Sequence, residues 1–210
     1  MEIQGTQESW SNMISNFISE FWMEIAAVVF AIIYLLLAVK QDVKCWFAAI
    51  ISSILYFFIM YDAGLYMEAY LQIFYIMMAF YGLQQWRSVN TDAPQFIVRT
   101  WDKRMHIKII TLIVIMTLIS GFLLEKYTNA IFPFIDGLTT WGAIVATYMV
   151  AKRLLENWIY WFVIDFISIF LFMSRGLFLT SGLFFIYLVI IYFGYMSWVK
   201  IRDDISAESS

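Results

Sequence analysis

Long apolar stretches recur along the whole of this 210-residue chain, and most of its charged residues lie in short segments between them. Hydrophobic residues make up 63% of the chain and charged residues 14%, and the mean hydropathy is +0.78. A soluble domain of this length cannot bury so much apolar surface, whereas about 20 apolar residues in a helix span a bilayer. The sequence therefore predicts an all-α membrane protein that crosses the lipid bilayer several times.

Seven apolar segments are candidates for spanning helices, although several are short for a hydrocarbon core about 30 Å thick. Their expected ranges are 22–39, 45–60, 66–86, 107–124, 134–151, 158–173 and 177–199. The expected organisation is a tail (1–21), a three-helix unit (22–86), a loop (87–106), a linker helix with its following loop (107–133), a second three-helix unit (134–199) and a tail (200–210).

The basic residues are distributed unevenly between the two sides of this arrangement. Only Lys126 and Arg175 lie on the same side as the N-terminus, and the other eleven of the thirteen Lys and Arg residues lie on the opposite side. Loops rich in Lys and Arg stay in the cytoplasm. We therefore expect a protein of the cell (inner) membrane with its N-terminus outside and its C-terminus in the cytoplasm.

The chain also repeats itself at an offset of 112 residues. Aromatic residues, glycines and leucines recur at this offset: Trp46 and Trp158, Leu71 and Leu183, Tyr75 and Tyr187, Gly82 and Gly194, Trp86 and Trp198. A gap-free match over about fifty residues indicates a duplication. Since one helix separates the two triplets, both enter the membrane in the same sense, which predicts a parallel 3+1+3 repeat. Transporters with such repeats bind their substrate between the halves, near the bilayer midplane.

One acid, Asp165, lies in the middle of the sixth apolar segment. Inserting a carboxylate there costs about 3 kcal/mol, so it needs compensation, and no Lys or Arg lies at its depth. Trp158, Trp161, Asp165, Ser168 and Phe172 follow helical spacings and share one face. A carboxylate beside an aromatic wall suits a flat cationic ring. The alternative is a structural role, in which Asp165 is protonated and hydrogen-bonded to another helix or paired with a buried cation.

The two halves differ at polar positions. At the 112-residue offset Asp165 corresponds to Ser53, Ser168 to Tyr56, and Gln72 to Phe184. Polar groups placed unequally in a symmetric frame indicate a binding site. The predicted substrate-binding residues are Trp158, Trp161, Asp165, Ser168, Gln72, Ser53 and Tyr56.

Several other functions are excluded by what the sequence contains. The net charge is −3 and the basic residues do not form a patch, which argues against nucleic acid as a partner. The single Cys45 allows neither an internal disulfide nor a cysteine-rich metal site, and the single His106 gives no metal site. No phosphate-binding loop or nucleophile elbow is present. We therefore expect no catalytic residues, no metal and no cofactor.

A family resemblance is carried by several short runs. They are ENWIYW at 156–161, followed by Asp165, RGLFLT at 175–180 and GYMSW at 194–198, with DAGLY at 62–66 and YG at 81–82 in the first half. The chain resembles the Pnu vitamin transporters along all seven helices. The resemblance implies a SWEET-like fold, facilitated diffusion of nicotinamide riboside, thiamine or a related vitamin, and substrate contacts from Trp158 and Trp161. It also implies a trimeric assembly, and trapping of the product by a cytoplasmic kinase.

At one position the chain departs from this family pattern. Nicotinamide riboside carriers typically have Asn where this chain has Asp165. Both vitamins carry a ring cation, but a carboxylate also accepts hydrogen bonds from the aminopyrimidine of thiamine. This favours thiamine, with nicotinamide riboside as the alternative substrate. The alternative from another class is a membrane scaffold or receptor that uses the aromatic face for helix packing.

Overall fold

The computed structural model describes residues 22–62, 66–87, 98–127, 132–174 and 178–208. The expected N-terminal tail, residues 88–97 of the expected loop 87–106, and the repeated residues Gly64 and Gly176 lie outside these ranges. Within them the chain is helical, as predicted. The helices are Trp22–Val39, α2 (Cys45–Asp62), α3 (Tyr66–Arg87), α4 (Lys103–Tyr127), α5 (Pro133–Ala151), α6 (Asn157–Ser174) and α7 (Phe178–Glu208).

Two of these helices, α4 and α7, extend furthest beyond the ranges that the sequence predicted. α4 begins at Lys103 instead of residue 107, and α7 continues to Glu208 instead of ending at residue 199. The apolar pattern ends where the chain leaves the hydrocarbon, but neither extension contains a Pro or Gly to end the helix. Part of the expected loop and most of the expected C-terminal tail are therefore helical.

The surface of the bundle is that of a protein embedded in lipid. Five helices are long and apolar enough to cross a membrane by length and composition, and Cys45–Tyr61 is a shorter apolar helix. Large apolar side chains point outward, including Ile107 and Phe122 of α4, which are 64% and 61% exposed. Polar residues such as Asp165 and Ser168 are buried. Since apolar groups face outward and polar groups inward, the protein is a multi-pass membrane protein.

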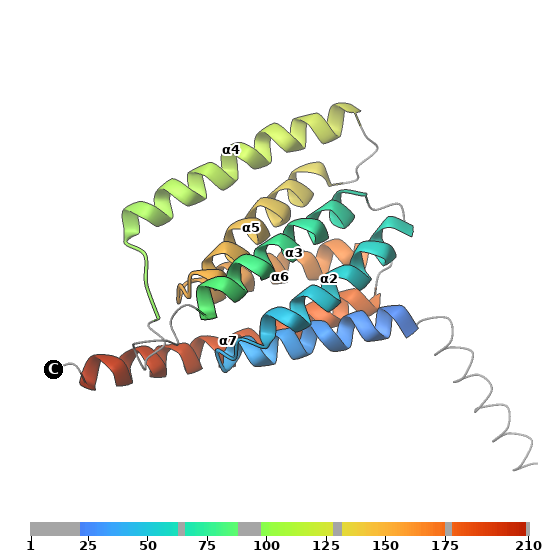
Figure 1. The fold of residues 1–210 in the computed structure, drawn as a ribbon. Coiled ribbons are helices and arrows are strands. Elements are labelled where there is room, and N and C mark those ends of the chain that lie inside the picture. The colour runs from blue at the N-terminus through green and yellow to red at the C-terminus, as the bar shows by residue number, and fades with distance from the viewer. Residues whose placement is uncertain (1–21, 63–65, 88–97, 128–131, 175–177, 209–210) are drawn as a thin grey trace, which may run out of the picture.

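The helices form two three-helix units with α4 at the edge of the bundle (Figure 1). α2 packs against α3 in the first unit, and α6 packs against α5 and α7 in the second. α3 and α5 bring the two units together, while α4 packs on α5. This is the predicted 3+1+3 arrangement, in which α4 is a linker outside both units.

The duplication extends to the backbone of the turn after the first helix of each unit. Gln41 has φ 55° and Arg153 has φ 56°, and among the described residues no other non-glycine residue has a positive φ. Their amides donate to Ala38 and Val150 at 3.0 and 2.9 Å. Both turns end the helix in the left-handed conformation of a Schellman motif. Two rare conformations separated by the repeat offset show that the units share one local fold.

Four tryptophans form a cluster that we call the tryptophan plug: Trp46, Trp86, Trp158 and Trp198. All four are 0–2% exposed. The rings of Trp46 and Trp86 meet edge to face at 5.3 Å, and those of Trp158 and Trp198 do so at 5.4 Å. Trp86 and Trp198 join the two pairs at 6.4 Å. The plug therefore fills the bundle between the units, near the turns that carry Gln41 and Arg153.

Two hydrogen bonds tie the plug across the two units. The indole Nε1 of Trp86 donates to the carbonyl of Ala151 at 3.2 Å, and that of Trp198 donates to the carbonyl of Ala38 at 3.1 Å. Each third helix therefore holds the end of the opposite unit's first helix. Arg153 donates to the carbonyl of Trp86 at 3.0 Å, and burial lowers the pKa of its guanidinium to about 10.

The segment before α4 is attached to the second unit. The amide of Arg99 donates to the carbonyl of Arg153, and the amide of Leu155 donates to that of Arg99, both at 2.9 Å. His106 in the first turn of α4 lies 3.0 Å from the hydroxyl of Tyr160 in α6. The linker helix is thus anchored to α5 and α6.

Candidate functional site

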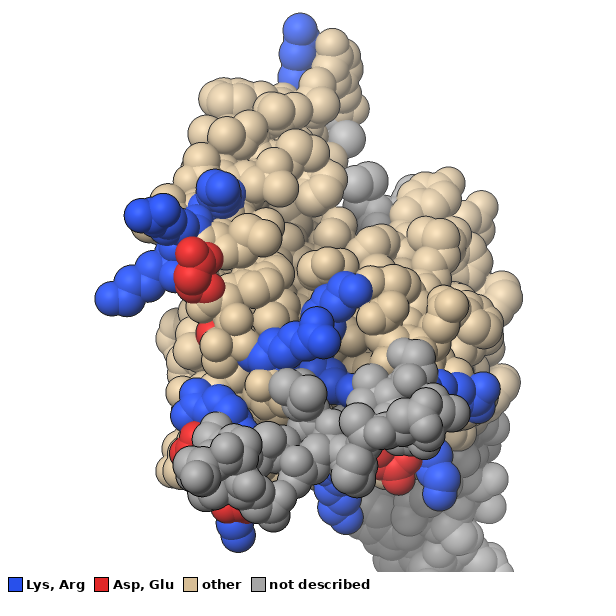
Figure 2. All heavy atoms as spheres, turned by 60° about the vertical axis from the view of Figure 1, so that its left-hand side comes forward, with Lys and Arg blue, Asp and Glu red and all other residues tan. Residues whose placement is uncertain are grey.

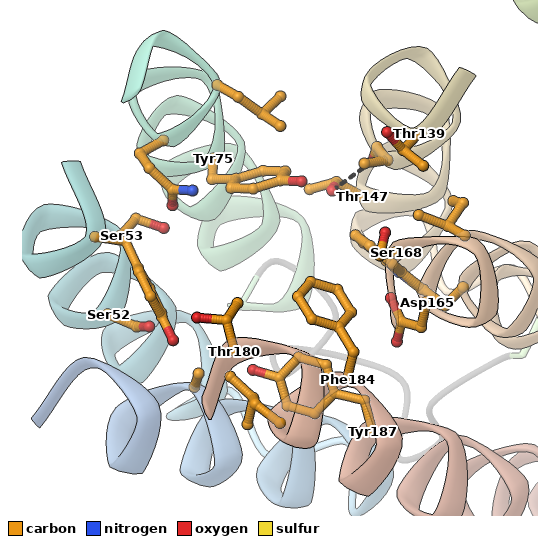
Figure 3. A pocket seen from close by; sticks show the side chains of 18 of the residues that line it. Ser52, Ser53, Tyr75, Thr139, Thr147, Asp165, Ser168, Thr180, Phe184 and Tyr187 are labelled. Carbon is orange, nitrogen blue, oxygen red and sulfur yellow. Dashed lines mark hydrogen bonds between the residues drawn. The ribbon is translucent and has the colours of Figure 1, made fainter. Parts of the chain in front are cut away.

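A cavity of about 240 Å³ lies between the two units (Figure 3). Its lining comes from the first helix, α2, α3, α5, α6 and α7, and none of the described residues of α4 takes part. The tryptophan plug borders it at the end where α3 and α7 carry Trp86 and Trp198, because Trp46 belongs to both the plug and the lining. The cavity thus occupies the place between repeats where the sequence analysis expected a substrate.

Asp165 lines this cavity from the middle of α6. It is 2% exposed, and its Oδ1 oxygen has no hydrogen-bond partner in the part of the chain that the structure describes. The cavity lining contains no Lys or Arg among the described residues. An ionised carboxylate in such a place carries a desolvation cost that protein groups do not offset here. The arrangement suits a ligand that brings a positive charge or a hydrogen-bond donor.

The helical face predicted for α6 is only partly a cavity wall. Trp161, Ser168 and Phe172 line the cavity with Asp165, as their spacing predicted. Trp158 does not belong to the lining. Its indole is packed in the tryptophan plug against Trp198. Trp158 lies one turn nearer the start of α6, where the units close on each other, so in this conformation it has a packing role.

The first unit supplies the opposite wall. Ser53, Tyr56 and Gln72 all line the cavity, from α2 and α3. The Tyr56 hydroxyl is buried and has no hydrogen-bond partner among the described residues. Figure 3 shows the side chains of Ser53 and Asp165 on opposite sides of the same space. Six of the seven predicted residues therefore surround one cavity, and their contact with a substrate stays a prediction.

Polar residues of α5 also line the cavity, and the sequence analysis missed them. They are Asp136, Thr139, Thr140 and Thr147. Thr139 and Thr147 donate to carbonyls one turn back in their own helix, at 3.0 and 2.7 Å. Their oxygens can still accept a hydrogen bond from a ligand. The available signal was the spacing of 136, 140, 143 and 147, which puts these positions on one helical face.

Three tyrosines add hydroxyl-bearing aromatic surface to the cavity: Tyr34, Tyr75 and Tyr187. Tyr75 and Tyr187 are repeat equivalents, from α3 and α7, and both line the cavity with Asp165. The sequence analysis used this pair only as evidence of duplication. Together with Trp161 they surround the acid with ring faces and hydroxyl groups, which can stack on a flat solute and hydrogen-bond to it.

These features define the class of protein. A largely aromatic and apolar cavity, with a buried carboxylate whose Oδ1 has no hydrogen-bond partner among the described residues, lies between two parallel three-helix units of a lipid-embedded bundle, which is the arrangement of a membrane transporter. Residues 21–200 match the family described as Nicotinamide mononucleotide transporter. The chain belongs to this family, which confirms the resemblance to the Pnu vitamin transporters. The protein is a transporter and not an enzyme.

Two curated relatives and one solved structure are similar to the chain. The Nicotinamide riboside transporter PnuC of Escherichia coli (strain K12) is 22% identical over 189 residues, which cover 78% of this chain and 79% of the relative. The Shigella flexneri protein of the same name gives the same values. The structure called Crystal structure of the Vitamin B3 transporter PnuC has a TM-score of 0.75 and 23% identity, covering 93% of this chain and 88% of that one. This likeness confirms the fold.

The preference for thiamine is not supported by these comparisons. Both named relatives are nicotinamide riboside transporters, so the alternative fits better. The preference depended on Asp165 alone, and the charge of a carboxylate suits the ring cation of either vitamin equally well. One residue's hydrogen-bonding capacity was too little to choose between two cations of similar size.

Proposed function

We propose that this protein carries nicotinamide riboside into the cell by facilitated diffusion across the inner membrane. The observation that supports this most is the Oδ1 of Asp165, which lies in an aromatic cavity and has no hydrogen-bond partner in the described ranges of the chain. The pyridinium ring of nicotinamide riboside is flat and positively charged, so it offers the compensating charge and a face for stacking. The names of the two curated relatives support the same substrate.

The cavity offers different chemistry for the two parts of this substrate. Trp161 and Tyr187 line the cavity with Asp165, and we place the pyridinium ring against these residues. The ribose hydroxyl groups need donors and acceptors, and Gln72 and Thr140 provide them elsewhere in the lining. Cation–π contact between the pyridinium ring and an aromatic side chain contributes about 0.5 to 2 kcal/mol. A hydrogen bond from the carboxamide of this ring to the charged carboxylate of Asp165 contributes about 1.5 to 3 kcal/mol. Ring recognition therefore dominates the affinity.

The orientation of the protein follows from the same proposal. Figure 2 views the end of the bundle where α4 begins and α5 ends, and Lys and Arg side chains gather on this face. We place this end in the cytoplasm by the positive-inside tendency, with the N-terminus outside. A cation then moves inward down the membrane potential, which contributes about 2.3 kcal/mol per 100 mV. Phosphorylation by a cytoplasmic kinase would keep the product inside. A homo-oligomer, trimeric by resemblance, stays a prediction.

Binding and flux measurements on the purified protein test this function. Calorimetry with nicotinamide riboside and thiamine should give the higher affinity for nicotinamide riboside. Proteoliposomes should equilibrate the labelled riboside with proton and sodium gradients collapsed, because the cavity holds an acid but no histidine among its described residues. Tighter binding of thiamine would overturn the substrate. Binding without flux would favour the receptor alternative, and flux lost with the gradients would show coupled transport.

A further inference from the structure

Two acids occupy equivalent positions in the two units. Glu24 and Asp136 are 112 residues apart; Glu24 is the third residue of the described range Trp22–Val39 of the first helix, and Asp136 lies in the first turn of α5. Both helices end at the turns that carry Gln41 and Arg153. The two acids therefore lie at the end of the bundle opposite the basic residues that follow these helices.

Both acids also continue cavity-lining helical faces. In the first helix, Ala31 and Leu35 line the cavity, and in α5 the equivalent residues Ala143 and Thr147 do so. Positions 24, 31 and 35, like 136, 143 and 147, are spaced by seven and four residues, which keeps them on one face. Asp136 itself belongs to the lining. A rise of 1.5 Å per residue puts Glu24 roughly 10 Å beyond Ala31 along the axis.

A separate observation connects these acids to a ligand. Tyr56 is only 9% exposed, lines the cavity and has a hydroxyl without a partner among the described residues. Asp165, deeper in the same cavity, also has a buried oxygen without such a partner. The cavity whose lining faces the two acids continue thus holds a buried hydroxyl and a buried carboxylate oxygen that have no partner among the described residues. Each of these groups attracts a cation or a hydrogen-bond donor.

We infer that Glu24 and Asp136 form an acidic entrance that concentrates organic cations at the cavity and disfavours anions. The inference rests on the proposed function, because it assigns the selection of a cationic substrate to these two residues. Low-dielectric walls focus the field of charges at the mouth of a cleft and raise the rate at which opposite charges enter. The field of exposed charges weakens when salt shortens the screening length from about 30 Å to 3 Å. Entry of the cation should therefore depend on salt.

A purely local role for the two acids predicts something else. Acids in the first turn of a helix stabilise it by interacting with the helix dipole. If that were their only role, neutralising them would lower stability slightly and leave the entry of cations and anions unchanged. The two explanations therefore differ in a rate and in its dependence on ligand charge.

The first experiment measures uptake of labelled nicotinamide riboside by proteoliposomes at low and high salt. Glu24→Gln with Asp136→Asn should raise KM roughly three- to tenfold at low salt and much less at high salt, with the maximal rate nearly unchanged. Glu125→Gln is the matched control, because Glu125 lies at the end of α4, is exposed and does not line the cavity. If the wild-type protein transports the riboside and the double variant has the same KM, the inferred acidic entrance is wrong and the proposed function still holds.

A second experiment does not depend on the substrate. In a Cys45→Ala background, Thr139→Cys places a thiol in the cavity lining, one turn inward from Asp136. The measured quantity is the ratio of its modification rate by a cationic thiosulfonate reagent to its rate by an anionic one. This ratio should be several times higher when Glu24 and Asp136 are present than in the variant that lacks both acids. The Glu125→Gln change should leave this ratio unaltered. An equal ratio with and without the acids, or no modification by either reagent, would overturn the inference even if the protein carries another vitamin.

Discussion

The two three-helix units agree where they hold each other and differ where they face the cavity. Each unit has the same turn with positive φ and the same tryptophan pair, and each sends an indole hydrogen bond to the other unit. In the cavity, by contrast, Asp165 faces a space lined on the other side by its equivalent Ser53. Duplication preserved the contacts that assemble the bundle, and divergence produced the polarity that can recognise an unsymmetrical solute.

Five divergent pairs line the cavity, and in them the carboxylate and the indole belong to the second unit. The pairs, first unit then second, are Leu35 and Thr147, Ala49 and Trp161, Ser53 and Asp165, Tyr56 and Ser168, Gln72 and Phe184. As far as the described residues show, the second unit thus holds both acids of the lining, Asp136 and Asp165, and one of its two indoles, Trp161. Because charge and aromatic surface are distributed unequally between the two walls of the cavity, a solute with a charged ring and a polar tail would bind in one orientation.

The largest expected effect distinguishes the packing role of Trp158 from the binding role of Trp161, both in α6. Trp158→Ala should lower the free energy of unfolding by about 3 to 5 kcal/mol, because it removes a fully buried indole from the plug. Trp161→Ala should instead weaken substrate binding roughly tenfold with a smaller loss of stability. Thermal unfolding in detergent and calorimetry on the folded protein measure the two effects. Loss of binding in a stable Trp158→Ala protein would restore Trp158 to the substrate site.

The next effect tests the inequality between Asp165 and Ser53. Asp165→Leu should weaken binding of nicotinamide riboside by about 1.5 to 3 kcal/mol, or roughly ten- to a hundredfold, because it removes a charge-assisted contact. Asp165→Asn keeps the shape of the side chain but removes its charge, so it should weaken binding almost as much as Asp165→Leu. Adding Ser53→Asp to Asp165→Asn should recover part of it, since both positions line the cavity.

Asp203→Asn is the control for these variants, because Asp203 is exposed on the extension of α7 and pairs with Arg202. Calorimetry on all variants should show the loss only when the cavity acid is removed. Unchanged affinity in a folded Asp165→Asn protein would mean that the acid is protonated and structural, and Asp165 would leave the site.

The third effect tests the contacts on which the units agree. A Cβ atom on Gly194 would lie 2.5 Å from the indole of Trp158, and a Cβ atom on Gly82 would come still closer to the indole of Trp46. Both Gly→Ala variants should therefore destabilise the protein by about 1 to 3 kcal/mol through overpacking. Gly182→Ala is the control, because nothing lies within 4 Å of its added Cβ. The melting temperature should fall in both glycine variants and not in the control. A fall in only one would contradict equivalent packing.

Much of this arrangement could be predicted from the sequence, for identifiable physical reasons. Lipid requires each spanning segment to satisfy its own backbone, so apolar length alone located the helices. The 112-residue offset gave the repeat, and helical spacing gave the cavity face of Trp161, Asp165 and Ser168. Periodicity assigns a residue to a face but not to a depth, so Trp158 was placed with Trp161 although one helical turn puts it in the plug.

Other parts of the site needed the three-dimensional packing. The α5 residues Asp136, Thr139 and Thr147 have ordinary polar side chains in a helix whose orientation the sequence does not fix. Tyr75 and Tyr187 were visible as a repeated pair, but a repeated residue can serve either packing or binding. Only the contact of α5 with both α3 and α6 shows that its polar face borders the space between the units.

The smallest effect tests whether the two indole hydrogen bonds between the units contribute equally to stability. Trp86→Phe and Trp198→Phe each remove one indole donor, at 3.2 and 3.1 Å, and keep an aromatic ring in the plug. Each should cost about 0.5 to 1.5 kcal/mol, plus a packing loss that the two variants share. Trp86 also contacts the guanidinium of Arg153 at 5.1 Å, so Trp86→Phe should cost slightly more. The double variant should lose more than either single variant, since both bonds hold the units together at the same end. Unfolding midpoints of the three variants measure this, and a double variant no less stable than the singles would show that one bond alone closes the plug.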